Sequence, residues 1–397
     1  MAIRLPCNPA TLAQSPDLPG SIYEPGEELF DVSEHESLLK ELTFGLQPGW
    51  GPQRPVFHSG LDLLRYNKVE ALSAGASLTS QLGLGYTARA VGRIGIGDGV
   101  PNGELSLARS NGRSEVRLGV FHRLAVANDD WGSPLSFGAS VSNLIDGATD
   151  DGFYYRAFGA ELRGTRDAPG PVGGVAMVWR LFAERHRSAG REPNTQASLG
   201  NLLGDSRFEE NIDPPTLTAL GAASDFARSF GVNPRRLRLD ARMRIEGAFL
   251  PASVLEDDYY ARAVLDGTIT RPLGGFSMSL TGAGGWSVGS LPIQRAFYVG
   301  GLHTVRGHFA RLGEGRVGDA FWLGRAELGR RSMAFRPTLF YDAGWAGPRT
   351  DISGGYRPLS GAGFGLSFLD GLLRTDVARG IWPEKSWRFD AYLGARF

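Results

Sequence analysis

The sequence contains several short patterns of the kind that carry chemistry in enzymes and metal sites. Residues 285–289 (GWSVG) match the G-x-S-x-G pattern of serine hydrolases, but they end an alternating stretch and precede Pro292, whereas a nucleophilic serine needs a strand, a sharp turn and then a helix. The glycine-rich strings at 95–99 and 361–365 lack the Lys-Ser/Thr pair or the βαβ context of a nucleotide site. The six histidines show no metal-ligand spacing. We therefore expect no enzyme, no cofactor and no metal.

Composition narrows the class of protein further. The chain has 397 residues, 42 basic and 42 acidic, so its formal net charge is zero, which argues against a nucleic-acid binder that works through a global basic field. Hydrophobic residues make up 42%, which argues against disorder. Cys7 is the one cysteine, so an internal disulfide framework is excluded. The most apolar segment, 172–179, is too short for a membrane helix and ends at Arg180.

Alternation with a period of two dominates the chain. Between Arg236 and Glu246 every even position is charged and every odd position is apolar. Successive side chains of a strand point to opposite faces, so this segment has one charged and one apolar face. Residues 386–397 repeat the pattern, with Trp387, Phe389 and the terminal Phe397 on the apolar face. These elements need apolar cover on one side and water on the other.

The alternation predicts about fourteen strands of roughly 9–15 residues. A soluble β-sandwich also alternates, but its polar faces are seldom so charged and its strands are usually shorter. A transmembrane antiparallel β-barrel explains both features, because lipid covers the apolar face, water meets the charged face and closure removes the unpaired edges. Aromatic residues near strand ends (Trp322, Trp345, Trp387 and Tyr392) are expected at the membrane interfaces. The strands are predicted near 67–79, 83–96, 102–109, 114–126, 151–165, 172–187, 235–249, 258–271, 275–288, 318–331, 335–346, 359–369, 371–381 and 386–397.

Two motifs carry a family resemblance. Residues 300–310 read GGLHTVRGHFA, and residues 340–344 read FYDAG. They resemble the V-R-G-F/Y and F-x-D-x-G motifs of the outer-membrane assembly and translocation superfamily, which includes BamA, TamA and the two-partner secretion transporters and is also called the bacterial surface antigen family. The stretches 322–329 and 361–397 fit its last strands, and 65–78 resembles the first barrel strand of some members. The resemblance covers about 65–397 and implies an all-β, sixteen-strand barrel with the VRGF-type loop between strands eleven and twelve.

The resemblance also implies site residues. Within the motifs Val305-Arg306-Gly307-His308 and Phe340-x-Asp342-x-Gly344, Arg306 is expected to meet Asp342 inside the barrel, with the loop folded into the lumen. Independently, alternation places Asp342 and Gly344 inward, and Glu327 is a plausible second partner. A buried arginine–carboxylate pair can be bidentate, but desolvation limits its net contribution to stability, so its expected role is to fix the loop. His308 replaces the usual aromatic residue and is a departure from the family pattern.

Three segments are harder to interpret. Residues 1–64 are too short for a complete POTRA repeat and are expected to be a periplasmic segment or linker, with a short helix between Asp31 and Leu42. The N-terminus lacks the apolar core of a signal peptide, so we expect a fragment of a longer protein, the alternative being a barrel without POTRA repeats. For residues 188–234 the sequence leaves three interpretations open: two weak strands, a lid, or a short helix near 216–230. Without two strands in this segment the barrel would have fourteen strands. Residues 133–146 predict a short helix at a barrel rim, and Asp146, Asp150 and Asp151 predict a turn rather than a calcium loop.

The expected function follows from the resemblance. It implies a protein of the bacterial outer membrane that inserts or translocates other polypeptides, with outer-membrane lipid, client polypeptides and periplasmic accessory proteins as partners and no nucleic acid. A weak seam between the first and last strands would let a client strand pair with a free edge. Two alternatives stay open: a passive pore, whose lumen arginines favour anions, and a membrane anchor of a larger protein. The arginines concerned are Arg236, Arg238, Arg242 and Arg244.

Overall fold

The structure, a computed structural model, describes most of the chain after residue 50. The strands and helices that the structure describes lie in one compact unit, Pro52–Phe397. The helix predicted between Asp31 and Leu42 and the terminal Phe397 lie outside the described residues. The described ranges are 51–145, 150–168, 174–204, 207–231, 236–251, 254–313, 315–330, 335–352, 354–368 and 373–393.

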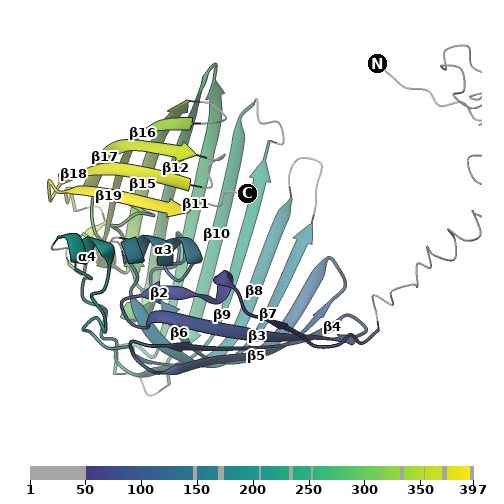
Figure 1. Ribbon diagram of the computed structural model, residues 1–397. Coiled ribbons are helices and arrows are strands. Elements are labelled where there is room, and N and C mark those ends of the chain that lie inside the picture. Colours follow the sequence, from purple (N-terminus) through teal and green to yellow (C-terminus); the bar gives the residue numbers. More distant parts are fainter. Residues whose placement is uncertain are drawn as a thin grey trace, which may run out of the picture. The chain divides into compact units, whose positions relative to one another are not determined.

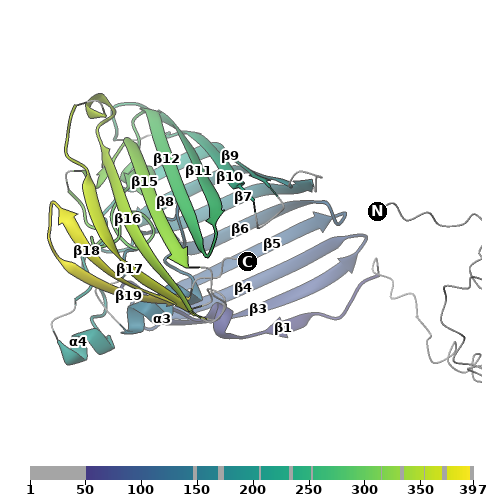
Figure 2. The ribbon, with the colours of Figure 1, turned by 90° about the horizontal axis from the view of Figure 1, so that it is seen from above.

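One large antiparallel sheet of seventeen strands forms the unit, and it curves strongly (Figures 1 and 2). Its strands are β1 (Val56–His58), β2 (Arg65–Asn67), β3 (Ala71–Gly83), β4 (Tyr86–Gly95), β5 (Pro101–Ser110), β6 (Ser114–Val126), β7 (Tyr154–Ala168), β8 (Val175–Ser188), β9 (Leu217–Phe230), β10 (Arg238–Phe249), β11 (Tyr259–Leu273), β12 (Phe276–Gly289), β15 (Ala320–Arg330), β16 (Phe335–Gly347), β17 (Leu359–Phe368), β18 (Leu373–Trp382) and β19 (Trp387–Leu393). The other elements of the described residues are β13 (Phe297–Tyr298) and β14 (Val317–Gly318), the helices α3 (Phe137–Ile145) and α4 (Leu199–Leu203), and the 3-10 turns η1 (Leu61–Leu63), η3 (Ile293–Arg295) and η4 (Arg349–Asp351).

The number of described strands in the large sheet agrees with the sixteen that the family resemblance implies. Both β1 and β2 pair with β3, Val56 opposite Thr79 and Asn67 opposite Ala71, so they form one strand that η1 interrupts. Among the described residues, eleven strands then precede the loop after β12 and five follow it. The fourteen strands read from the sequence lacked two: β9, inside the segment 188–234, and this interrupted first strand. Since β1 lies before residue 65, the sheet begins earlier in the chain than the expected domain boundary.

Two of the uncertain segments now have a structure. The helix predicted near 216–230 is wrong, because these residues form β9, which pairs with β8 and β10 along its length. Small residues (Ala219, Gly221, Ala223) weakened its alternation. The helix predicted within 133–146 is confirmed as α3. Ser136 caps it, since its Oγ accepts a hydrogen bond from the backbone N–H of Ala139 at 3.2 Å.

The apolar face of the strands is exposed and the charged face turns inward. Leu118, Phe158 and Leu265 are 56%, 63% and 63% exposed, whereas Arg244 and Glu246 on the inner face contact other side chains. Within the described residues, no second sheet covers the apolar face. Two of the four aromatic residues expected at the interfaces lie elsewhere: Trp345 is buried, and Tyr392 donates to Asp376 on the inner face at 3.0 Å.

The two ends of the strands differ. One end carries tight turns, such as Gly274-Gly275 between β11 and β12, where Leu273 pairs directly with Phe276 and Gly274 has a φ of +59°, as a two-residue hairpin requires. The other end carries long segments, including 127–153, 189–216 and 290–319. In the described part of the chain, no helix is both long and apolar enough to cross a membrane.

Candidate functional site

The segment between β12 and β15 (residues 290–319, called the VRGH loop below) packs on the inner face of the sheet. Near its two ends β13 pairs with β14, Phe297 opposite Gly318 and Tyr298 opposite Val317. Val305 is fully buried in an apolar cluster that the loop shares with the wall. Apolar packing and a short strand pair therefore hold the loop on both sides of Arg306.

Arg306 is completely buried and forms an ion pair with Asp342 of β16. Its Nε donates to Oδ2 of Asp342 at 2.6 Å and its Nη2 donates to Oδ1 at 2.8 Å, the forked geometry of a strong arginine–carboxylate contact. The backbone N–H of Arg306 donates to the same Oδ2 at 3.2 Å. The guanidinium lies over the ring of Phe340, 3.5 Å from its centroid. Asp342 thus fixes both the main chain and the side chain of the loop at this point.

Further charged groups surround the same guanidinium. Oε1 of Glu327 lies 2.7 Å from Nη1 of Arg306, and Oδ2 of Asp376 lies 3.4 Å from it. Arg325 and Arg374 lie in the same cluster, which therefore contains three arginines, counting Arg306. It also contains three carboxylates, those of Glu327, Asp342 and Asp376. The charges of this cluster balance, which limits the cost of burying them.

The charge state of Arg306 follows from these neighbours. Burial acts to lower the pKa of Arg306, but the hydrogen bond and charge of Asp342, with the charges of Glu327 and Asp376, raise it above its usual value. The guanidinium is therefore a permanent cation that no accessible pH removes. Such a group can hold a loop in place, but it cannot serve as a proton acceptor.

Gly307 and His308 bring the loop into contact with β17 and β18. Gly307 has a φ of +87°, and a Cβ there would lie 2.6 Å from the backbone nitrogen of Gly380, so only glycine permits this approach. His308 is fully buried, with Nε2 2.9 Å from the carbonyl oxygen of Ser360. Because a carbonyl only accepts, Nε2 donates. Burial lowers the pKa of His308, so the ring is neutral at pH 7.

Gly344 provides a second close approach, on the wall side. A Cβ at this position would lie 3.1 Å from side-chain carbons of both Leu323 and Val299. Val299 belongs to the VRGH loop, so the absence of a side chain at Gly344 lets the loop pack closely against β16. Both residues of the wall motif therefore contact the loop, Asp342 at Arg306 and Gly344 at Val299.

Arg295, near the beginning of the same loop, binds strands of the inner face other than β16. Its Nη2 lies 2.5 Å from Oε1 of Glu184 in β8, and its Nε lies 2.7 Å from Oε1 of Glu246 in β10. It also donates to the hydroxyl of Tyr155 in β7. Arginine–carboxylate pairs therefore hold the VRGH loop at Arg295, on β8 and β10, and at Arg306, on β16.

Asp151, just before β7, joins the loop to the last strand. Its Oδ2 accepts from the backbone N–H of Leu302 at 2.9 Å and its Oδ1 from that of Ala310 at 3.0 Å. Both oxygens also accept from the guanidinium of Arg388 in β19, at 2.9 and 2.8 Å. Burial opposes ionisation, but Arg388 and the two backbone N–H groups hold the pKa of Asp151 below its usual value. One carboxylate therefore ties three segments together.

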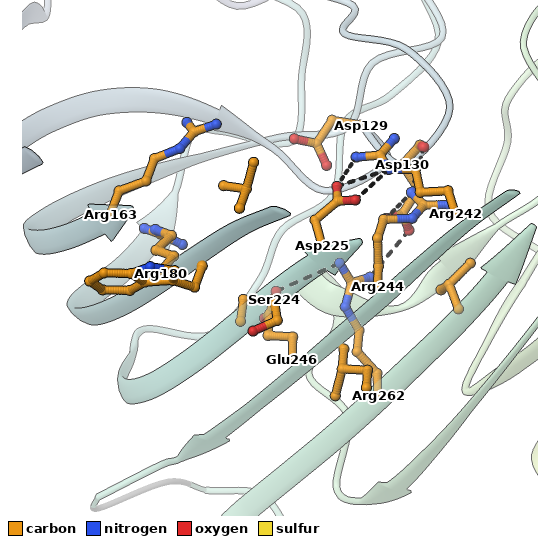
Figure 3. A pocket seen from close by; sticks show the side chains of 15 residues that line it. Asp129, Asp130, Arg163, Arg180, Ser224, Asp225, Arg242, Arg244, Glu246 and Arg262 are labelled. Carbon is orange, nitrogen blue, oxygen red and sulfur yellow. Dashed lines mark hydrogen bonds and ion pairs between the residues drawn. The ribbon is translucent and has the colours of Figure 1, made fainter. Parts of the chain in front are cut away.

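A cavity of about 280 Å³ on the inner face is lined by residues of both charges (Figure 3). Nε of Arg242 donates to Oδ2 of Asp225 at 2.8 Å, and Nη1 of Arg244 lies 2.9 Å from Oδ1 of Asp130. Arg238 pairs with Asp240 at 2.8 Å. Three of the four arginines that would make a pore favour anions thus have carboxylate partners, which neutralise the field expected from the sequence.

The structure brings most of the sequence-derived residues together. Arg306 of the loop meets Glu327, Phe340 and Asp342 of the wall. Gly344 meets the loop at Val299, whereas Gly307 and His308 contact β18 and β17 instead. Phe397 lies outside the described residues. Sequence reasoning missed Arg295, Asp151, Asp376 and Arg388. Alternation could have placed Asp376 and Arg388 on the inner faces of β18 and β19, but Arg295 and Asp151 lie outside the sheet and carry no periodic signal.

The fold and this site define a class: an antiparallel barrel of the outer-membrane type, with a long loop docked inside. Among solved structures, the chain is similar to BamA from Haemophilus ducreyi lacking POTRA domains 1–3, with a TM-score of 0.54 and 12% identity over 90% of this chain and 77% of that one. CdiB from Escherichia coli matches at a TM-score of 0.49 and 13% identity, over 87% of this chain and 62% of its own. CdiB from Acinetobacter baumannii matches at 0.46 and 15%, over 85% and 59%, so the chain spans less than two thirds of either CdiB.

The similarity to BamA confirms the barrel fold that the sequence motifs predicted. No family model matches the sequence, and no curated protein matches it.

Proposed function

We propose that this chain is a barrel of the bacterial outer membrane that helps other polypeptides to insert into, or cross, that membrane. The observations that carry the proposal are the similarity of the barrel to the BamA fold and, among the described residues, a first and a last strand that each have one paired neighbour. Within the described residues, the paired registers give β19 one neighbour, β18, and give β2 one neighbour, β3. An unpaired edge is a template for an additional strand.

The VRGH loop supports the same function. Arg306 and Asp376 join the loop to β18, and Arg388 joins it to β19 through the carbonyl oxygen of His308 at 3.0 Å. The loop therefore braces the strands next to the free edge from inside. The role we assign to the contact between Arg306 and Asp342 is to keep that edge in the shape that an incoming strand can join, rather than to act on the client itself.

The test is site-specific photo-crosslinking in reconstituted liposomes. A photoreactive phenylalanine analogue replaces Phe389 in β19, and in a matched variant it replaces Phe158 in β7; both side chains point outward and are more than half exposed, at 53% and 63%. A small unfolded outer-membrane barrel is added as client. We expect crosslinks from position 389 and few from position 158. Equal crosslinking at the two positions, or none at 389 while the client inserts, contradicts the proposal.

A passive pore is the alternative that the charged inner face supports. The VRGH loop and the Asp130 contacts with Arg244 and Arg262 occupy part of that inner face. We therefore expect a small, fluctuating conductance in planar bilayers. A large and steady conductance would favour the pore instead.

A further inference from the structure

A helix lies where the two ends of the sheet face each other. α3 packs against both β2, in the interrupted first strand, and β19, the last strand, and Figure 1 shows it between them. No register within the described residues pairs β19 with β2 or β3. The seam between the first and last strands is therefore occupied by a helix at the end of the barrel that carries the long loops.

The surface of α3 is the reverse of that of a helix on a water-soluble protein. Its buried residues are small or polar: Gly138, Ser140, Ser142 and Asn143. Its large apolar side chains point away from the protein, with Phe137 36%, Leu144 50% and Ile145 42% exposed. A helix in water buries its apolar side, whereas the outward faces of these strands are apolar as well. Lipid is the surrounding that satisfies the strands and α3 at once.

Side chains attach α3 and its flank to both edges of the seam. Nδ2 of Asn143 donates to the backbone carbonyl of Tyr66 in β2 at 3.1 Å. Oδ2 of Asp150 accepts from the backbone N–H of Lys68, which directly follows β2, at 2.7 Å. The next residue, Asp151, holds Arg388 of β19. Two consecutive carboxylates thus bind opposite edges of the same seam.

We propose that α3 with Asp150 and Asp151 forms a clasp across the seam: α3 faces the lipid with its apolar side and shields the edge of β19 until a client strand replaces it. The second half of this statement rests on the proposed function. A helix satisfies its backbone groups internally, so it can cover a strand edge but cannot extend the sheet. A client strand offers that edge a full set of backbone hydrogen bonds, and the exchange therefore favours the client.

The first experiment tests the position of α3 without any client. An environment-sensitive fluorophore is attached to a cysteine at Leu144 in a Cys7→Ser protein, and quenching by lipids that carry a quencher in the acyl chain is measured in liposomes. Leu118 on the outward face of β6 and Thr165, which lines an inner-face cavity, provide the matched controls. We expect position 144 to be quenched like position 118. Quenching like that of position 165 overturns the clasp.

The second experiment tests release. Asp151→Asn weakens the hold on Arg388, and Asn143→Leu removes the hold on Tyr66 without touching the VRGH loop. With the photoreactive group at position 389, both variants should crosslink the client severalfold faster, whereas Asp167→Asn, an exposed acid at the far end of β7, should not. Unchanged rates in both variants overturn the clasp while the proposed function stands. If no variant crosslinks client yet position 144 contacts lipid, the proposed function fails and the resting clasp stands.

Discussion

Asp151 and Arg388 are 237 residues apart in the chain, yet two hydrogen bonds of 2.9 and 2.8 Å join their side chains. One lies at the entrance to β7 and the other in the last strand. The same carboxylate accepts from the backbone of the VRGH loop. The contact therefore links the VRGH loop, the last strand and the segment that carries α3.

Arg306→Lys should destabilise the barrel although the charge is kept. Lysine cannot form the forked contact with Asp342 or lie flat on Phe340, and disturbing a fully buried pair costs about 3 kcal/mol. Thermal unfolding followed by the loss of the compact form on unboiled gels measures the effect. Arg271→Lys, exposed at the turn end of β11, is the control and should match the wild type. Equal unfolding temperatures of the two variants would show that the contacts of the Arg306 guanidinium do not stabilise the barrel.

Gly307→Ala should loosen the VRGH loop. The new Cβ would lie 2.6 Å from the backbone of β18, in addition to a strain of about 1 kcal/mol for alanine at positive φ. Gly112 has a nearly equal φ, +83° against +87°, but no atom within 4 Å of its Cβ position, so Gly112→Ala shares the strain without the clash. Trypsin cleavage after Arg311, which lies in the loop, should accelerate in the first variant alone. Similar cleavage in both would assign the effect to strain only.

Stability should fall as the pH drops through the range in which free histidine titrates. The folded state lowers the pKa of His308, so the unfolded chain binds the proton more tightly, and the stabilising contribution of the neutral ring is complete above about pH 6.5 and lost below it. His308→Phe keeps a buried ring and removes the titration. The difference in unfolding temperature between pH 7.5 and pH 5 should therefore be smaller in this variant. A larger difference would contradict the assignment of a neutral buried ring.

Arg295→Met should open the lumen. Without this guanidinium, Glu184 and Glu246 lose their shared cation and the beginning of the VRGH loop loses its attachment to β8 and β10. Mean conductance in planar bilayers should rise severalfold. Arg163→Met also removes an arginine that lines the inner-face cavity, but it leaves the loop attached and should change conductance little. Equal changes in both variants would mean that charge, rather than the loop, controls ion flow.

Local pattern was sufficient where the structure is local. The alternation of Arg236–Glu246 and of residues 387–392 correctly predicted which side chains point outward, because successive residues of a strand face opposite ways whatever their neighbours are. The alternation pattern did not predict β9, because small residues such as alanine on both faces of this strand leave no contrast between a polar and an apolar face. It failed again at β1 and β2, which η1 divides into pieces of three residues each, too short to show a period.

The sequence by itself determined fourteen of the sixteen described strands and the apolar outer face, and its resemblance to a family implied the barrel class and the contact between Arg306 and Asp342. Only the tertiary structure decided that Arg295 binds Glu184 and Glu246, that Asp151 holds Arg388, and that α3 lies between β2 and β19. The physical reason is that a side chain's direction is set by its own backbone, whereas its partner is set by strand register and by the path of loops, which many distant contacts determine together. Ionic partners on the inner face are therefore invisible until the sheet has curved and the loops have folded onto it.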